Sequence, residues 1–365
     1  MGIAIEVVLL VVLVIAAYMQ QTMFGKRPRG NRLKKIKQSP HYKKGSFQNL
    51  SATPNFTNGA NFFTVLKDFL FTGYERTKPA VVIPTQKINL KKLDKNQDVL
   101  VWFGHSSYFM QVDGKRILVD PVLSGSASPL PGGTKSFKGV DVYTADDMPE
   151  IDFLFISHDH WDHLDHKTVT AIQPKVKQVI CGLGTGAHLE HWDYTPEQII
   201  EKDWYEEIEL TDGFKVYTTP ARHFSGRTFV RNKALWLSFV LKTPTMQIFI
   251  GGDSGYDTHF AEIGNKFGSF DLAILENGQY NKSWANIHTL PEELMQVAKD
   301  LKAKRILPVH SAKFKLSTHA WDEPLKKAVE NGRKENISVL TPMVGEPLHL
   351  KNQNQAFTQW WLGLN

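Results

Sequence analysis

The chain has 365 residues, of which 42% are hydrophobic and 22% are charged. This composition is typical of a globular protein and excludes disorder over most of the length. The single cysteine excludes an internal disulfide framework and a cysteine-rich zinc module. The formal net charge is +6, but nine basic side chains and one acid lie before residue 45, so acids outnumber bases by two in the rest of the chain. A nucleic-acid-binding body is therefore not expected.

Residues 3–19 form an apolar run that only Glu6 interrupts, and the basic cluster follows it directly. The run is at the short end of the roughly 17–25 residues that a membrane-crossing helix needs. No Lys or Arg precedes it, which disfavours a cleaved signal peptide. Because positive charge stays on the cytoplasmic side, the rest of the chain would lie in the cytoplasm. We therefore predict a single-pass membrane anchor, with a cleaved signal or a buried apolar helix as alternatives.

The sequence beyond this run changes character several times. A basic and then Ser-, Asn-, Gly- and Pro-rich stretch predicts an extended linker. Residues 62–71 are apolar and predict a helix that packs on the body. Short strand patterns follow from residue 98, and helical patterns interrupt them at residues 291–301 and 323–330. The predicted anchor, linker, N-terminal arm, body and C-terminal tail are residues 1–20, 21–60, 61–97, 98–350 and 351–365. Strands broken by occasional helices predict an α/β body with two sheets and outer helices.

The most informative segment is residues 157–166, SHDHWDHLDH, which follows an apolar run typical of a buried strand. It presents four metal-competent side chains within six positions, namely His158, His160, Asp162 and His163. Imidazole nitrogen and carboxylate oxygen are ligands that zinc and similar metals take. In an extended segment His158 and His160 point to the same side, and a following turn can direct Asp162 and His163 to a second ion. The simple alternative is an exposed histidine-rich loop.

Three further metal-competent residues each follow an apolar run, at the end of a predicted strand. They are His223 in TPARHFSGR, Asp253 in FIGGDSGY and His310 in RILPVHS. A lone histidine in such a place is more often structural than functional. Only the combination with the histidine-rich segment indicates a metal site.

Together these motifs resemble the metallo-β-lactamase superfamily, whose HxHxDH signature precedes separate His, Asp and His ligands. The resemblance spans about residues 98–350 and implies a four-layer αββα sandwich of two mixed sheets with outer helices. Within the superfamily, several stretches are similar to the N-acyl-phosphatidylethanolamine phospholipase D family and its bacterial relatives. They are GHSS at 104–107, LVDPVLS around Asp120, PARHFSGR, GGDSGY and NIHTLPEE at 286–293. Related sugar-lactone hydrolases share the early elements.

The resemblance implies two zinc ions and seven ligands. One zinc would be held by His158, His160 and His223, the other by Asp162, His163 and His310, with Asp253 bridging them. Asp162 and Asp253 would thus also be catalytic. The same donors accept manganese or iron.

Other residues receive roles near the metals. His288 resembles a histidine near the leaving group, so it is expected to act as a general acid or to orient the substrate. Asp120 and Asp165 are candidates for orienting ligand imidazoles, although Asp165 is equally well placed to cap a following helix. Arg227 would hold a phosphate oxygen or lie on the surface. Two further candidates for ligand support or substrate contact are His105 and Tyr256.

The leading functional hypothesis is a dinuclear zinc-dependent phosphodiesterase of phospholipase D type, acting on an N-acyl-phosphatidylethanolamine-like phospholipid or a related phosphodiester. The alternative is a lactonase or other carboxylic ester hydrolase of the same fold. The near-neutral body disfavours a nuclease, and the full ligand set disfavours a non-catalytic binding module. The expected partners are a phospholipid or small ester substrate and a membrane, without nucleic acid.

One motif competes with this interpretation. Residues 182–187, GLGTGA, fit the G-x-G-x-x-G/A pattern of dinucleotide-binding proteins. The HLEHW sequence that follows is a poor first turn for a phosphate-binding helix, so a glycine-rich strand exit is the better interpretation. Cys181, just before it, is expected to be a small buried hydrophobe.

Overall fold

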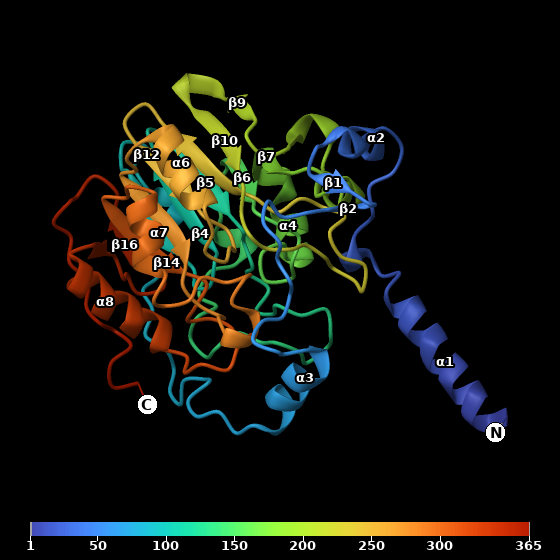
Figure 1. The fold of residues 1–365 in the computed structure, drawn as a ribbon. Helices are drawn as coiled ribbons and strands as arrows, with labels where there is room; N and C mark the ends of the chain where they lie inside the picture. Colours follow the sequence, from blue (N-terminus) through green and yellow to red (C-terminus); the bar gives the residue numbers. More distant parts are fainter. Residues whose placement is uncertain (1, 365) are drawn as a thin grey trace.

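The computed structural model describes residues 2–364, with side chains from residue 5 onwards (Figure 1). The helices are α1 Gly2–Tyr18, α2 Gly30–Gln38, α3 Phe62–Phe71, α4 His166–Ile172, α5 Gly186–His191, α6 His259–Phe267, α7 Leu294–Asp300 and α8 Glu323–Glu335. The first strands are β1 Tyr42–Lys43, β2 Ser46–Phe47, β3 Val99–Trp102, β4 Tyr108–Val112, β5 Lys115–Val119, β6 Ile151–Ile156, β7 Val176–Gly182 and β8 Ile199–Lys202. The later strands are β9 Glu207–Glu209, β10 Lys215–Thr219, β11 Ser238–Lys242, β12 Gln247–Ile250, β13 Leu272–Glu276, β14 Arg305–Val309, β15 Ser338–Val339 and β16 Pro347–His349.

Two seven-stranded sheets form the centre of the molecule. One has the order β16-β3-β4-β5-β6-β7-β8 and the other the order β15-β14-β13-β12-β11-β10-β9. In the first sheet β5 to β8 run parallel and β16, β3, β4 and β5 are antiparallel neighbours. In the second sheet β12 to β15 run parallel and β9 to β12 are antiparallel neighbours. Both sheets are therefore mixed.

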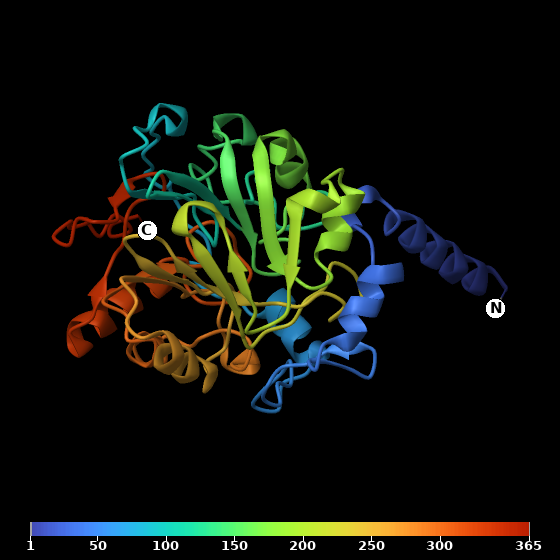
Figure 2. The same cartoon turned by 90° about the horizontal axis from the view of Figure 1, so that it is seen from above.

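The alternation of side chains along each strand explains the layers. On β4, Met110 packs in the core between the sheets, whereas its neighbour Phe109 packs on the opposite face with residues of α4 and α5. Phe249 of β12 likewise faces outwards, against α6 and α7. Burying a large apolar side chain stabilises a fold by about 1.5–3 kcal/mol, so both faces of both sheets contribute. Helices thus cover the outer face of each sheet (Figure 2), and the predicted α/β sandwich with outer helices is confirmed.

Several strands end at one edge of the sandwich. In the first sheet β3, β5 and β6 point the same way, because β4 is antiparallel to both β3 and β5. In the second sheet β10, β12, β13 and β14 share a direction for the same reason. Loops that leave the carboxyl ends of these strands therefore have a common place to meet.

The first helix corrects one prediction. α1 is a 17-residue apolar helix that projects away from the body (Figures 1 and 2). At the α-helical rise it extends about 25 Å, less than the hydrocarbon core of about 30 Å. Among residues 2–364, no helix combines the length and the apolar character needed to cross a bilayer. The predicted single-pass anchor at residues 1–20, and the cytoplasmic placement derived from it, are therefore wrong.

Residues 22–57, named the N-terminal strap from here on, lie along the body. Their α2 helix is amphipathic and buries Ile36, while Arg32 binds Glu190 at 2.7 Å and Glu201 at 2.6 Å. Phe47 is also fully buried. Polar and apolar contacts together hold the strap in a defined path.

The helix predicted at residues 62–71 is present as α3. Its start is capped by Asn61, whose Oδ1 accepts from the backbone N–H groups of Phe63 and Thr64. Phe69 stacks on Trp284 with ring centroids 6.0 Å apart, but Phe63 and Phe71 are 78% and 79% exposed. Helix α3 thus touches the body on one side and presents apolar side chains to solvent on the other.

Candidate metal centre

The histidine-rich segment forms the loop between β6 and α4. Leu164 N–H donates to the His160 carbonyl at 2.8 Å and closes a tight turn. Asp165 ends the loop: its Oδ1 accepts from Lys167 N–H at 3.2 Å at the start of α4, and its Oδ2 accepts from Ser124 N–H at 3.1 Å. Asp165 therefore caps a helix and ties two loops together, and it has no contact with a ligand imidazole in the described hydrogen bonds.

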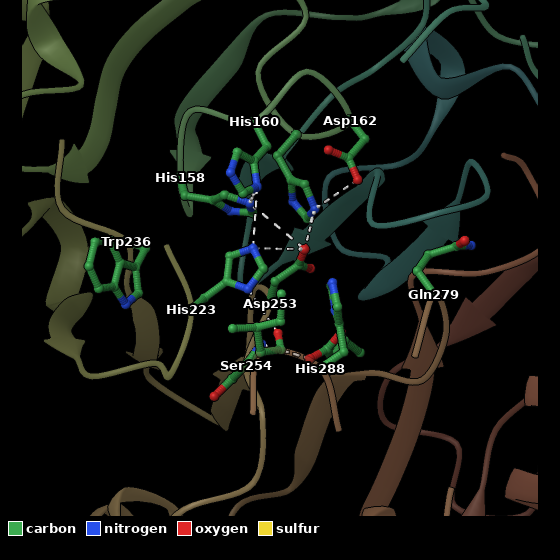
Figure 3. A network of polar contacts seen from close by, with 12 residues as sticks. His158, His160, Asp162, His223, Trp236, Asp253, Ser254, Gln279 and His288 are labelled. Atoms are coloured by element: carbon green, nitrogen blue, oxygen red, sulfur yellow. Dashed lines mark hydrogen bonds and ion pairs between the residues drawn. The ribbon is translucent and has the colours of Figure 1, made fainter. Parts of the chain in front are cut away.

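Three imidazoles from two loops converge on one point (Figure 3). The Nδ1 atom of His160 lies 2.9 Å from Nε2 of His158 and 3.2 Å from Nε2 of His223. Nitrogen ligands about 2.05 Å from a tetrahedral zinc would be about 3.3 Å apart. The second ring nitrogen of His223, Nδ1, donates to the Ile287 carbonyl at 2.8 Å, so Nε2 carries the free lone pair. This spacing fits a three-histidine metal site.

A second group lies on the other side of Asp253. Its Oδ2 is 3.1 Å from His163 Nε2, 3.7 Å from His223 Nε2 and 3.8 Å from His158 Nε2. Its Oδ1 is 3.2 Å from His310 Nδ1. Asp162 completes this group, with its Oδ2 3.7 Å from His163 Nε2. The structure therefore brings all seven predicted ligands together, with Asp253 between the two groups.

Two buried side-chain atoms of the seven proposed ligands lack a hydrogen-bond partner among residues 2–364. They are His163 Nε2 and Asp253 Oδ1. An unpartnered buried polar atom costs about 1–3 kcal/mol, unless something absent from the polypeptide satisfies it. Both atoms face the cluster, so they fit ligation of a metal ion.

Asp120 and His105 support the second group. Asp120 Oδ2 accepts from His163 Nδ1 at 2.8 Å and from the Ser157 hydroxyl at 2.6 Å. His105 Nε2 lies 2.9 Å from Asp162 Oδ2. Both predicted supporting residues thus contact ligands through their side chains.

Three residues at this edge have backbone conformations that L-residues rarely adopt. The φ angles are +54° at His105, +41° at Asp120 and +68° at His310, and each residue lies just beyond a strand end. Such conformations cost of the order of 1–3 kcal/mol each and concentrate at functional sites. The geometry here is imposed by the surrounding fold.

The predicted histidine outside the ligand set has a partner that the sequence interpretation missed. His288 Nδ1 lies 2.6 Å from Glu276 Oε2, and Glu276 Oε1 accepts from Ser254 N–H at 2.7 Å and Thr289 N–H at 3.1 Å. The glutamate therefore holds His288 and the residue after Asp253 at once. The only signal in the sequence is an acid at the end of an otherwise apolar strand.

Burial and charge set the protonation of the donors. Burial lowers the pKa of His158, His223 and His310 well below the ordinary value, so these rings are neutral and able to bind a metal. Burial disfavours the charged form of Asp253, but His163 outweighs this and lowers the aspartate pKa to about 2. Burial likewise opposes protonation of His163, yet Asp253 and Asp162 raise its pKa. The centre thus offers the neutral imidazoles of His158, His223 and His310 beside ionised carboxylates, whereas the raised pKa of His163 favours its protonated ring.

Burial raises the pKa of Glu276 to about 7, although His288 opposes the shift. His288 itself has a raised pKa: burial lowers it, but Glu276 and Asp253 prevail. Both shifts favour retention of a proton on this pair near neutral pH.

Two residues predicted to contact substrate, Arg227 and Tyr256, have other contacts in the structure. Arg227 is buried, and its guanidinium donates to the backbone carbonyls of Met23, Asp159 and Leu164 while stacking on Trp161 at 3.9 Å. It ties the histidine-rich loop to the N-terminal strap, and its guanidinium is engaged by these backbone carbonyls. Tyr256 donates to Asp300 at 2.9 Å and stands outside the cluster.

The glycine-rich segment is not arranged for a nucleotide. Glu201 Oε1 accepts from the N–H groups of Gly184 and Gly186, at 2.7 and 3.0 Å. A carboxylate thus fills the place that a phosphate would take at the start of α5. Cys181 is buried, as expected for a small hydrophobe.

The fold and this constellation define a class of protein. Residues 115–311 match the family model described as the beta-lactamase superfamily domain, and the chain belongs to the metallo-β-lactamase superfamily. It is a metal-dependent hydrolase of that superfamily.

Individual proteins within the superfamily are similar to this chain. The chain is 36% identical to an uncharacterized protein of Mycobacterium tuberculosis over 85% of its length and 84% of the relative. It is 27% identical to the N-acyl-phosphatidylethanolamine-hydrolyzing phospholipase D 1 of Caenorhabditis elegans over 78% of its length and 84% of the relative. The solved structure of Igni18, a metallo hydrolase from Ignicoccus hospitalis, aligns with a TM-score of 0.53 and 20% identity, over 69% of this chain and 98% of that chain. The last comparison supports the fold alone.

Proposed function

We propose that this protein is a dinuclear metal phosphodiesterase of phospholipase D type that hydrolyses an N-acyl-phosphatidylethanolamine-like phospholipid. The observation that carries the proposal is an apolar cavity of 770 Å³ that reaches the ligands His160 and Asp162. The activity named for the C. elegans relative points the same way. Zinc is the proposed metal, because neutral imidazoles and carboxylates suit it well.

The proposed ligand sets are the two groups described above, with Asp253 shared. Two metal ions there would supply Lewis acidity to both the attacking and the leaving oxygen of a phosphodiester. The polypeptide supplies the rest: it fixes the imidazole nitrogens, keeps the carboxylates ionised and shapes the cavity. This division of labour suits a displacement at phosphorus.

The apolar cavity is formed by segments far apart in the chain. Its wall includes Ile15 and Phe24 near the end of α1, Leu130 from the loop after β5, and Phe224 and Phe229 from the loop after β10. A second cavity of 360 Å³ adjoins it and is lined by five of the seven proposed ligands together with His288. The two cavities have four lining residues in common, His160, Asp162, Phe224 and Arg231. An acyl chain in the larger cavity would thus place its headgroup beside the metals.

Arg231 is the proposed contact for the phosphate charge. Its guanidinium stacks on Phe224 at 4.7 Å and lines both cavities. Arg227, which the sequence suggested as a contact for a phosphate oxygen, instead donates its hydrogen bonds to backbone carbonyls. His288 is proposed to protonate the leaving oxygen through Nε2, because Glu276 holds its Nδ1.

The deciding experiment uses zinc-loaded protein and N-acyl-phosphatidylethanolamine in ¹⁸O-labelled water. We expect N-acylethanolamine and phosphatidic acid as products, with the label in the phosphate of phosphatidic acid. Label in a released carboxylate, or turnover of a sugar lactone without turnover of the phospholipid, would refute the phosphodiesterase assignment in favour of an ester hydrolase.

A matched pair of variants tests the cavity. Phe229 is 84% exposed at the cavity rim, and Val82 is 61% exposed elsewhere. We expect Phe229→Asp to raise KM about tenfold for a long-chain phospholipid, since a charge at the rim disfavours an acyl chain by about 1–2 kcal/mol, and Val82→Asp to leave it unchanged. Equal KM values in the two variants would mean that acyl chains bind elsewhere.

A further inference from the structure

The metal ligand His223 lies in a segment without regular secondary structure. Residues 220–237 connect β10 to β11 and contain neither helix nor strand. Helical and strand backbones position a ligand through their own hydrogen bonds, whereas this segment needs partners from elsewhere. The ring of His223 has one in the Ile287 carbonyl.

The backbone of His223 is held by Asn49 of the N-terminal strap. The His223 N–H donates to Asn49 Oδ1 at 3.1 Å, and Asn49 Nδ2 donates to the His223 carbonyl at 2.8 Å. One side-chain amide thus satisfies both backbone groups of one residue, as a neighbouring strand would. The residues are 174 positions apart in the chain, so the pairing is a product of the tertiary fold.

A third hydrogen bond fixes the orientation of this amide. Trp236 Nε1 donates to Asn49 Oδ1 at 3.0 Å. Two N–H donors therefore point at the same atom, which must be the oxygen, because the amide nitrogen has no lone pair to offer. Both partners are buried, with His223 and Trp236 each 1% exposed. Loss of Asn49 would leave the His223 N–H without its acceptor, whereas Trp236 Nε1 would keep its second acceptor, the Ala221 carbonyl at 3.0 Å.

Contacts on either side of Asn49 keep it in register. Phe47 N–H donates to the Asn232 carbonyl at 2.9 Å, and Arg222 donates to the Ala52 carbonyl at 3.0 Å. The strap thus runs beside the His223 segment both before and after the amide. No comparable contact joins the strap to His163 or His310 in the described hydrogen bonds.

We propose that Asn49 is a positioning residue of the metal centre, which holds the backbone of His223 so that its Nε2 meets the nitrogens of His158 and His160. The proposal rests on the metal ligands assigned above. It confines the effect of Asn49 to the three-histidine site and assigns the N-terminal strap a part in metal binding.

The test is zinc binding, measured by chelator competition and by metal analysis, on the full chain. Asn49→Ala removes all three hydrogen bonds, and Asn49→Gln keeps an amide at the wrong distance. Gln48→Ala is the matched control, because its exposed amide contacts only the strap itself. Thermal unfolding of each metal-free protein is recorded in parallel, which separates metal binding from general stability.

We expect both Asn49 variants to bind one zinc with wild-type affinity and the other 10–100-fold more weakly, the usual cost of losing a residue that orients a ligand. Gln48→Ala should match the wild type. Unchanged affinities in both Asn49 variants, or equal weakening of both zinc ions in proportion to a lower unfolding temperature, would overturn the proposal. A wild-type protein that binds no zinc would overturn the metal assignment as well.

Discussion

The two halves of the proposed metal centre are built differently. In the three-histidine group, His223 depends on the path of the backbone, because it is held by the Ile287 carbonyl at its ring and by Asn49 at its main chain. His158 of this group contacts a neutral side chain, the Ser157 hydroxyl at 3.0 Å. The group of Asp162, His163 and His310 depends on polar side chains from Asp120, His105 and Ser106.

This difference separates two ways of making a ligand rigid. Backbone anchoring places a neutral imidazole without adding charge, which suits a site made only of histidines. Side-chain anchoring adds the carboxylate of Asp120 to a group that already contains Asp162, so the second half carries more negative charge. Substitutions that alter charge should therefore affect the second half, and substitutions that alter chain path the first.

The largest effect is expected from a change of Asp253, the proposed ligand common to both halves. Asp253→Ala should reduce both zinc affinities and abolish measurable turnover, because its carboxylate lies 3.7 Å from His223 and 3.8 Å from His158 of the first group and 3.1 Å from His163 of the second. Metal analysis and activity on the same preparation check this. Retention of two zinc ions in the variant would show that Asp253 does not bridge them.

His288 lies beside both halves but outside the ligand set. His288→Ala should lower kcat about 10²–10⁴-fold for an alkyl leaving group while metal content stays the same. The loss should be much smaller with a nitrophenyl phosphodiester, because that leaving group needs no proton. Equal losses with both substrates would rule out a role as general acid.

Asp120 contacts the second half directly through His163, and it reaches His158 of the first half only through the Ser157 hydroxyl, which lies 3.0 Å from His158 Nδ1. The Asp120 carboxylate accepts three hydrogen bonds, from His163 Nδ1, from the Ser157 hydroxyl and from the Ser157 N–H. Asp120→Asn places a donor against one of these donors and should weaken the second zinc about 10–100-fold, and more than the first, because His163 is the ligand that Asp120 contacts directly. Asp152→Asn is the control. Asp152 lies at the start of β6 and accepts from the Arg116 N–H, whereas the histidine-rich loop follows the other end of this strand. If Asp120→Asn lost the zinc of the three-histidine group instead, Asp120 would have been assigned to the wrong half.

The last effect concerns the stability of the fold at low pH, near the proposed shared ligand, and leaves metal binding at neutral pH unchanged. Burial lowers the pKa of His259, which lies 3.2 Å from the Ser254 hydroxyl, to about 4. The unfolded chain therefore binds more protons than the folded one between about pH 4 and 6.5, and stability falls as pH falls through this window, by up to about 3 kcal/mol. Chemical unfolding of wild type and His259→Gln at pH 7 and 4.5 should show a weaker pH dependence in the variant. Identical slopes would exclude His259 as the cause.

Much of the architecture was predictable because the metal-competent residues directly follow the apolar runs that form the strands. Apolar runs that end in His or Asp predicted both the strands and the edge at which their loops meet. Asn49 and Glu276 escaped prediction for a physical reason: each acts through contacts with distant segments, and neither residue type stands out in its local sequence. The anchor prediction failed because an apolar run shows composition, whereas spanning also needs length.

The left-handed backbone at His105, Asp120 and His310 has a consequence for metal uptake. Those three turns are held in unfavourable conformations by the sandwich itself, through reciprocal hydrogen bonds such as His310 N–H to the His105 carbonyl at 2.9 Å. A cation arriving from solution would thus bind at a preorganised site, whose backbone is already in its final conformation. Loading should be limited by shedding of the ion's water shell, with no slow rearrangement of the polypeptide to follow.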